Sequence, residues 1–253
     1  MRPVVMIHGA FCGGWVFDDF RRPFEAVGFD MLTPDLPGHG PDENPAGQSM
    51  SDYARAIADV CEAQSEPAIL IGHSLGGLVA QMAAARLATR RRPVAALILL
   101  APSSPWGVTG TSMEEAVSAF GLYGLGPYWL QSVDPQYDVA LNYSLNNLTR
   151  VRADEIFARM VPESGRALFE TLNWWLDPMM TTSVSAIGVP TLTIAGGRDV
   201  IHPPATVRQT AARLGGAFRT FPQMSHWLPA EPGWDDVAAA CLEWLTQEAR
   251  AAA

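Results

Sequence analysis

The sequence predicts an α/β protein in which a mostly parallel, six-stranded sheet carries helices on both faces. Short runs of branched apolar residues alternate with longer amphipathic stretches along the 253 residues, and this alternation is typical of parallel sheets. Hydrophobic residues make up 48% of the chain and charged residues 17%, which favours one compact core over disorder. A chain of this length can bury such a core in one domain.

Six short apolar runs, each bounded by turn-forming residues, are the predicted strands. Ligands bind beyond the carboxyl ends of parallel strands, so residues that directly follow a strand are the first candidates for a site. The predicted strands are residues 4–7, 30–33, 68–71, 95–100, 191–195 and 218–221.

Amphipathic stretches between these runs are the predicted helices. Pro203 and Pro204 mark the entry of one helix, because proline fits the first helical turn. Asp235 and Asp236 favour the start of the last helix, where negative charge complements the helix dipole. The predicted helices are residues 15–27, 50–64, 75–89, 205–214 and 234–249.

The pentapeptide GHSLG at residues 72–76 lies between the third predicted strand and the third predicted helix. A strand, a glycine turn and a helix are the setting in which G-x-S-x-G acts as a nucleophile elbow. Gly72 and Gly76 lack a Cβ, so the turn can hold Ser74 in strained backbone geometry with its hydroxyl exposed. The five-residue pattern alone is weak, and its flanking elements make it specific. Ser74 is the predicted nucleophile.

A serine hydroxyl is a poor nucleophile at neutral pH and requires a base and an orienting acid. Asp199 follows the fifth predicted strand and His226 follows the sixth, in the chain order Ser, Asp, His that this arrangement requires. We predict His226 as the base and Asp199 as the acid. Asp177 and the pair at residues 235–236 are the alternatives for the acid, and the helix terminus already explains that pair.

The segment HGAFCGGW at residues 8–15 follows the first predicted strand. A glycine-rich loop at this place is the expected source of one backbone amide for the oxyanion, and the amide after the nucleophile supplies the second. We assign these amides to Ala10 and Leu75, and we expect Phe11 to contact the substrate.

With strands, elbow, acid and base in this order, the chain resembles the α/β-hydrolase superfamily over nearly all of its length. The loop at residues 8–15 is similar to the H-G-A-x-x-G-x-W loop of the methylesterase and hydroxynitrile-lyase branch. The lyases of that branch carry Thr where this chain has Gly9, and a Lys shortly before the catalytic His, where this chain has Gln-Met-Ser at residues 223–225. The resemblance therefore favours the esterase side and implies the α/β-hydrolase fold.

That resemblance implies a serine hydrolase that cleaves a carboxylic ester, or a lactone or thioester, through an acyl-enzyme. Epoxide hydrolases and haloalkane dehalogenases share the fold but use Asp as nucleophile, so Ser74 argues against both. Two alternatives stay open. One is a lyase or biosynthetic cyclase that uses the same triad for proton transfer, and the other is a non-catalytic small-molecule receptor.

The segment from residue 103 to residue 185 is too long for one crossover between the fourth and fifth predicted strands. We expect a helical cap inserted there, with residues 1–102 and 186–253 as the hydrolase core. Aromatic and methionine side chains are frequent in the segment. Trp174, Trp175 and Met179 lie near its return to the core and are the predicted wall of an apolar substrate site. The alternative is that they only pack the cap onto the core.

Charge and cysteine content restrict the partners. A net charge of -9 disfavours nucleic acid and anionic membrane surfaces, and the longest apolar run, residues 94–101, is far shorter than the ~20 residues that span a bilayer. Three widely spaced cysteines indicate no disulfide framework, and the histidine spacing indicates no metal site. We expect a small apolar ester as the partner, no cofactor, and a cytoplasmic location, because the first strand leaves no room for a signal peptide. Oligomeric state is not predicted.

Overall fold

In the computed structural model, which describes residues 2–251, six strands form one sheet. The predicted α/β class is confirmed, and the six predicted strands are present with ends shifted by at most two residues. The strands are β1 (Pro3–Ile7), β2 (Asp30–Leu32), β3 (Ile69–His73), β4 (Ala96–Leu100), β7 (Thr191–Gly196) and β8 (Ala217–Phe221). They lie in the order β2–β1–β3–β4–β7–β8, and all neighbouring pairs are parallel.

Five helices pack on this sheet, namely α1 (Arg22–Ala26), α2 (Met50–Glu62), α3 (Leu75–Thr89), α8 (Pro204–Leu214) and α9 (Trp234–Ala251). Both α2 and α3 begin at the predicted residues. At the start of α2, the side chains of Ser49 and Asp52 accept each other's backbone amides in a capping box. None of the helices within residues 2–251 is long and apolar enough to cross a bilayer.

The predicted helix at residues 15–27 is wrong as a single element. Gly14–Phe17 form a 3-10 turn, and α1 begins only at Arg22. Pro23 has no amide hydrogen and fits only the first turn of a helix, so a new helix starts there. The apolar pattern that suggested one helix is satisfied by packing instead, because Phe20 and Phe24 are fully buried.

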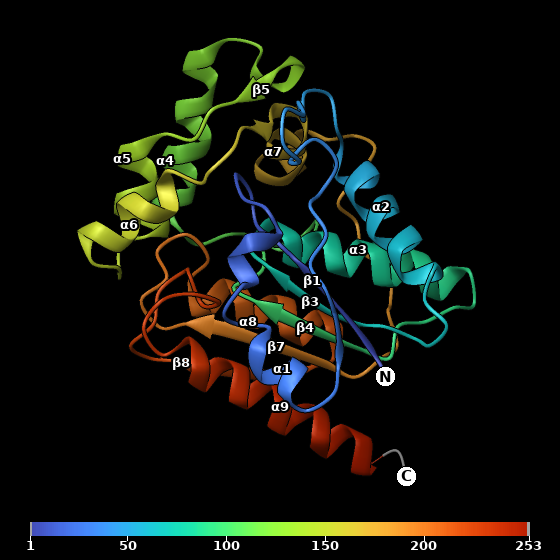
Figure 1. Cartoon of the computed structure of the whole chain (residues 1–253). Helices are drawn as coiled ribbons and strands as arrows, with labels where there is room; N and C mark the ends of the chain where they lie inside the picture. The colour runs from blue at the N-terminus through green and yellow to red at the C-terminus, as the bar shows by residue number, and fades with distance from the viewer. Residues whose placement is uncertain (1, 252–253) are drawn as a thin grey trace.

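Side chains of the central strands alternate between two apolar layers. Val4 and Met6 of β1 pack in a cluster with α1 and α9, whereas Val5 and Ile7 pack with α2 and α3. This alternation follows from the two-residue period of a strand. In Figure 1, α9 and α1 lie on one side of the sheet and α3 on the other. Each of the four side chains is inaccessible to solvent, and burying one contributes about 1.5–3 kcal/mol to folding.

Residues 103–185, between β4 and β7, form a separate group of short elements that we call the insertion. It contains α4 (Met113–Leu122), α5 (Tyr137–Val139), α6 (Arg150–Phe157), α7 (Gly165–Leu172) and the antiparallel pair β5 (Ser132–Val133) and β6 (Glu163–Ser164). In Figure 1, α4, α5 and α6 are grouped above the sheet, and α7 lies closer to α2.

Many large apolar side chains of the insertion are exposed, whereas those in the rest of the described chain are mostly buried. Met113 and Phe120 of α4 are each 72% exposed, and Met179 is 81% exposed. Among the exposed large hydrophobic residues of the described chain, Val27 alone lies outside the insertion. Apolar surface therefore gathers on one part of the molecule.

Candidate active site

The sheet has a topological switch point between β1 and β3. From β1 the chain continues to β2 on one side, and from β3 it continues to β4 on the other side. Loops that leave neighbouring strands in opposite directions open a crevice at their carboxyl ends. The loop after β1 and the turn after β3 meet there: a Cβ built on Gly9 would lie 3.1 Å from the Cβ of Ser74.

Ser74 occupies a sharp turn between β3 and α3. Its backbone has a φ of +53° and a ψ of -124°, a strained combination for a residue with a side chain. The turn is held by the Ser74 amide, which donates to the Leu100 carbonyl at 3.0 Å, and by the Ser74 carbonyl, which accepts from the amides of Gly77 and Ser103. A Cβ on Gly76 would lie 2.2 Å from the His8 carbonyl oxygen, so only glycine allows the elbow to pack directly on the end of β1.

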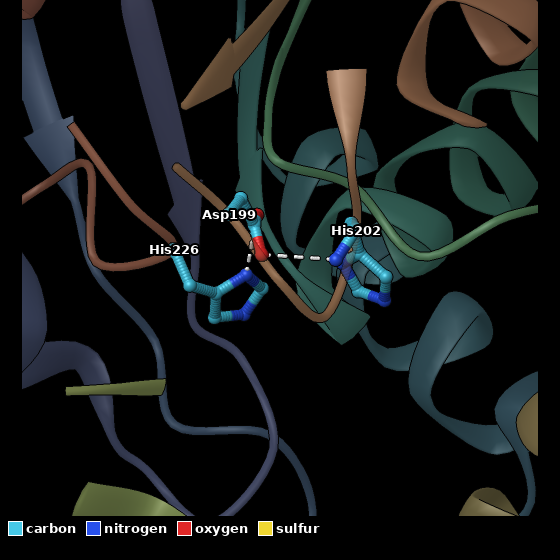
Figure 2. Close-up of side chains that lie close together, drawn as sticks. All are labelled: Asp199, His202 and His226. Carbon is cyan, nitrogen blue, oxygen red and sulfur yellow. Dashed lines mark hydrogen bonds and ion pairs between the residues drawn. The ribbon is translucent and has the colours of Figure 1, made fainter. Parts of the chain in front are cut away.

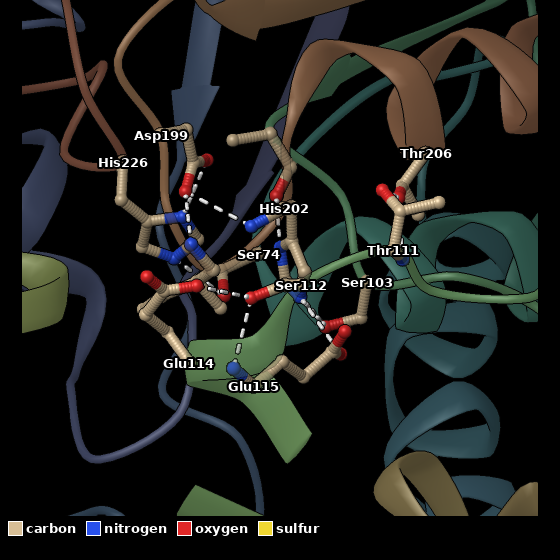
Figure 3. A network of polar contacts seen from close by, with 12 residues as sticks. Ser74, Ser103, Thr111, Ser112, Glu114, Glu115, Asp199, His202, Thr206 and His226 are labelled. Atoms are coloured by element: carbon tan, nitrogen blue, oxygen red, sulfur yellow. Dashed lines mark hydrogen bonds and ion pairs between the residues drawn. The ribbon is translucent and has the colours of Figure 1, made fainter. Parts of the chain in front are cut away.

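His226 joins Ser74 to Asp199. The Nδ1 atom of His226 lies 2.9 Å from Oδ2 of Asp199, and its Nε2 atom lies 3.0 Å from Oγ of Ser74. A carboxylate only accepts, so Nδ1 carries the hydrogen, and Nε2 is left to accept a hydrogen bond from the Ser74 hydroxyl. The three residues follow β3, β7 and β8 and are 3–8% exposed. Figure 2 shows the Asp199–His226 bond, and Figure 3 adds Ser74.

Asp199 is held as a carboxylate. Its Oδ1 atom accepts the backbone amides of Ile201 and His202 at 2.8 and 2.9 Å. Burial on its own raises the pKa of Asp199, but the charge and hydrogen bond of His226, together with the charge and amide of His202, outweigh burial, so the pKa lies below its usual range. An ionised Asp199 can fix the tautomer of His226 and stabilise an imidazolium.

The alternative acids lie in other environments. Asp177, in the insertion, accepts the nearby amides of Met179 and Thr181 in a local turn. Asp235 and Asp236 lie in the first turn of α9, as expected from the helix dipole. The structure therefore brings Asp199 to His226 and gives the other carboxylates local roles.

The amides of Ala10 and Leu75 lie on the two loops that meet at Ser74. Leu75 is the first residue of α3, where an amide has no partner within the helix. Within residues 2–251 the structure gives neither amide an acceptor. The next amide along the first loop, that of Phe11, is engaged by Glu163 of the insertion at 3.3 Å.

Two further histidines hold these loops in place. Nδ1 of His8 donates to the Gly9 carbonyl, and its Nε2 accepts the Leu36 amide. Nε2 of His73 donates to the His226 carbonyl at 2.8 Å. Burial lowers the pKa of His8 to about 4 and that of His73 to about 3, so both rings are neutral near pH 7.

His202 is a neighbour of the site that the sequence pattern did not distinguish from a loop residue. Its ring lies 5.1 Å from that of His226, its Nδ1 donates to the Ala101 carbonyl, and its Nε2 lies 3.7 Å from Oε1 of Glu115 in the insertion. Burial lowers the pKa of His202, but Glu115 reverses the direction and the pKa is raised. The available signal was its spacing, three residues after Asp199. Figures 2 and 3 show the His202 side chain close to Asp199 and His226.

A cation would find three possible ligands here, but each is already engaged. Asp199, His202 and His226 offer ligand atoms that lie within 4.8 Å of one another. The Asp199 and His226 atoms bond to each other, and His202 Nδ1 bonds to a carbonyl. A metal ion would have to displace these bonds, so we assign the cluster to the orientation of His226.

The predicted substrate-wall residues lie in two different environments. Phe11 is half-buried against an apolar cluster of the insertion, and Trp174 packs edge-to-face on Trp106 with ring centroids 5.5 Å apart. Trp175 and Met179 are 63% and 81% exposed. Contact with substrate stays a prediction for all four, and it is better supported for Phe11, whose backbone flanks Ala10.

Known proteins are similar to most of the chain. The model of the alpha/beta hydrolase family matches residues 4–240. The pimeloyl-[acyl-carrier protein] methyl ester esterase of Neisseria meningitidis serogroup A is 30% identical over 228 residues, which cover 86% of this chain and 68% of the relative. The protein of the same name from Stenotrophomonas maltophilia is 29% identical over 248 residues, which cover 96% and 92%.

Solved structures share the fold. The methylesterase MES16 from Arabidopsis has a TM-score of 0.75 at 17% identity, with 97% of this chain and 99% of that chain covered. An extracellular alpha/beta-hydrolase from a Paenibacillus species has a TM-score of 0.71 at 18% identity, with 98% of each chain covered. These identities show the fold alone. The resemblance predicted from the elbow and from the loop after β1 is confirmed: the chain belongs to the alpha/beta hydrolase family.

Proposed function

We propose that the protein is a serine hydrolase that cleaves a carboxylic ester through an acyl-enzyme. One observation carries the proposal, the continuous hydrogen-bonded series from Ser74 through His226 to Asp199 at the switch point of the sheet. A receptor has no need of an imidazole whose free nitrogen accepts from a strained, buried serine. The esterase names of the curated relatives support the same chemistry.

In the first half of the reaction, Oγ of Ser74 attacks the ester carbonyl carbon and its proton moves to Nε2 of His226. The carboxylate of Asp199 stabilises the resulting imidazolium. The amides of Ala10 and Leu75 donate to the carbonyl oxygen as it becomes an oxyanion. When the tetrahedral intermediate collapses, the alcohol leaves with the proton from His226, and the acyl group stays on Ser74.

In the second half, water replaces the alcohol. His226 accepts a proton from this water as it attacks the acyl carbonyl, and the same two amides hold the second oxyanion. Collapse returns the proton to Ser74 and releases the acid. No cofactor takes part in this proposal.

The insertion forms a cap over this site in our proposal, with residues 1–102 and 186–253 as the core. It contacts three of the four loops that carry the site through side chains: Glu163 binds the loop of Phe11, Glu115 faces His202, and Asn147 donates to Glu231 behind His226. Its apolar side chains favour an apolar small-molecule ester, lactone or thioester. The relatives' names make a methyl ester of an aliphatic acid the first substrate to test.

A cytoplasmic location belongs to the same proposal. Its support is that Cys12, Cys61 and Cys241 are all free and buried, as expected where thiols are kept reduced.

Turnover of an ester panel tests the proposal. The panel contains p-nitrophenyl acetate, longer p-nitrophenyl esters, aliphatic methyl esters and lactones. We expect hydrolysis of at least one substrate, and Ser74→Ala should lower kcat on the order of 10⁶-fold with an unchanged circular dichroism spectrum. Turnover that a folded Ser74→Ala protein retains would rule out Ser74 as the nucleophile.

A further inference from the structure

Glu163 of β6 is a fully buried carboxylate outside the Ser74 site. Its Oε1 atom accepts the Tyr53 hydroxyl and the Ser164 amide, both at 2.7 Å. Its Oε2 atom lies 3.1 Å from Nε2 of His39 and 3.3 Å from the amide nitrogen of Phe11. Donors from α2, from two core loops and from the insertion itself thus converge on one carboxylate.

The carboxylate and the imidazole form a charged pair. Burial alone raises the pKa of Glu163, but His39, together with the hydrogen bonds from Tyr53 and Ser164, outweighs burial and the pKa is lowered. Burial alone lowers the pKa of His39, and Glu163 reverses this so that the pKa is raised. The rings of His8 and Tyr53 also face His39, at centroid distances of 5.0 and 5.8 Å. Hydrogen bonds to a buried charge are strong, so this cluster holds its donors firmly.

One of the donors belongs to the loop that carries the proposed oxyanion amide. The insertion binds Phe11 on both sides of its backbone, because Glu163 accepts the Phe11 amide and the Val161 amide donates to the Phe11 carbonyl at 3.0 Å. Phe11 has a φ of +62°, an unfavourable value for a residue with a side chain, which needs support from its surroundings. The Phe11 amide that Glu163 binds belongs to the peptide plane between Ala10 and Phe11. Fixing the orientation of this plane also limits the backbone rotation of Ala10.

We propose that Glu163, charged and paired with His39, is a positioning residue that orients the Ala10–Phe11 peptide and thereby the Ala10 amide at the oxyanion. This inference rests on the proposed function and deepens it. The insertion then contributes to catalysis through the geometry of the loop after β1, and only a seated insertion completes the oxyanion site.

A simpler alternative is that Glu163 only fastens the insertion to the core. Glu170 of α7 offers a matched control for that role. It is also a buried carboxylate of the insertion, and its Oε2 atom accepts the amide of Met50 at the start of α2 at 2.8 Å. Arg166 pairs with its other oxygen. Glu170 ties the insertion to the core as Glu163 does, but to a helix terminus in place of the oxyanion loop.

The test compares Glu163→Gln, Glu170→Gln and Tyr53→Phe in the full chain. For each variant, kcat and KM are measured with a p-nitrophenyl ester, and inhibition is measured with an alkyl trifluoromethyl ketone, which forms a tetrahedral oxyanion adduct with an active-site serine. In Glu163→Gln we expect kcat to fall about 10- to 100-fold. This decrease is at most comparable to the decrease in kcat that follows removal of one oxyanion donor. KM should change by less than about threefold, and the inhibition constant should rise by the same factor as kcat/KM falls, because inhibitor and transition state share the oxyanion.

In Glu170→Gln, kcat and the inhibition constant should stay within about twofold of the wild type. Tyr53→Phe removes the hydroxyl that donates to Glu163 and keeps the charge of Glu163, so it should lower kcat only about threefold. If Glu163→Gln does not fold, Tyr53→Phe is the variant that tests the positioning role. Equal effects of Glu163→Gln and Glu170→Gln on kcat would overturn the proposal, as would unchanged kcat in Tyr53→Phe when Glu163→Gln is unfolded. Failure of the proposed function can be distinguished from failure of this inference. If the wild-type protein hydrolyses no ester, the proposed function fails before any variant is compared.

Discussion

Two buried histidine–carboxylate pairs, His226–Asp199 and His39–Glu163, share geometry and differ in consequence. The nitrogen–oxygen distances are 2.9 and 3.1 Å. In both pairs the histidine lowers the pKa of its carboxylate below the usual range. Nε2 of His226, the nitrogen that does not bind Asp199, lies within hydrogen-bond distance of Ser74. Oε1 of Glu163, the oxygen that does not bind His39, accepts hydrogen bonds from the Tyr53 hydroxyl and the Ser164 amide.

This comparison teaches that burial and pairing do not by themselves identify a base. Perturbed pKa values accompany both structural and catalytic clusters. The distinguishing feature is a reacting atom within hydrogen-bond reach of the imidazole at the switch point of the sheet. We therefore assign proton transfer to the first pair and loop geometry to the second.

The largest expected difference between the pairs is in catalysis. Asp199→Asn should lower kcat about 10⁴-fold, because Asn supports the wrong tautomer of the imidazole. Its oxygen can still accept the amides of residues 201 and 202, so circular dichroism and the Tm should change little. Asp177→Asn is the matched control and should hydrolyse esters at the wild-type rate. The reverse order of activities would move the acid to the insertion.

The next difference is in stability. His39→Gln leaves the buried carboxylate of Glu163 without its charge partner, and breaking a buried pair in this way costs about 3–5 kcal/mol. We expect a lower free energy of unfolding in urea and a decrease in kcat of about tenfold, far smaller than for Asp199→Asn. Unchanged stability in His39→Gln would contradict a charged His39–Glu163 pair.

The stability that the His39–Glu163 pair provides should depend on pH, and its two members set opposite limits. The lowered pKa of Glu163 gives stability that is present above about pH 4.3, the carboxyl pKa of an unfolded chain, and is lost as pH falls through the lower folded value. The raised pKa of His39 gives stability that is complete below about pH 6.5 and is lost as pH rises through the higher folded value. The stability difference between wild type and His39→Gln should therefore peak at about pH 5–6.5.

Ester hydrolysis depends on the Ser74 cluster and not on the His39–Glu163 pair, so its pH profile should differ from that of stability. Urea unfolding and kcat/KM, both measured from pH 5 to pH 9, check this contrast. A stability difference that is constant over the whole range would contradict the ionised pair. Parallel pH profiles of stability and activity would argue that one cluster governs both.

The smallest expected effects are at the exposed side chains of the insertion. Trp175→Ala and Met179→Ala should change stability by less than about 0.5 kcal/mol, as surface substitutions do. Trp174→Ala should cost more, because Trp174 packs on Trp106. If these residues line the acyl site, the ratio of kcat/KM for short and long p-nitrophenyl esters should shift while phosphonate labelling stays unchanged. A parallel loss in all three measures, with a lower Tm, would indicate packing alone.

Local sequence patterns were sufficient for the sheet and for the Ser74 cluster. Each strand is a short apolar run, and Ser74, Asp199 and His226 each follow a strand, so chain order and the strand ends together predicted that they would meet. A helix boundary was harder to predict, because Pro23 interrupts an apolar pattern that otherwise suits one helix from 15 to 27.

The second cluster could not be predicted from the sequence. Glu163 and His39 are separated by 124 positions, and neither lies directly after a predicted strand. Their contact depends on how the insertion sits on the core, which no periodicity encodes. Similarly, the sequence distinguishes His202 only by its spacing from Asp199, and the His202 amide donates to Asp199 in the structure.

The most direct test of the central claim is to map the site of covalent modification by a fluorophosphonate at neutral pH. The probe reacts with an activated serine regardless of the natural substrate, so no knowledge of the acyl group is needed. Peptide mass spectrometry of the labelled wild-type protein should place a single adduct on Ser74, and Asp199→Asn should label far more slowly. An adduct on another residue, or no labelling of a folded wild-type protein, would contradict the account.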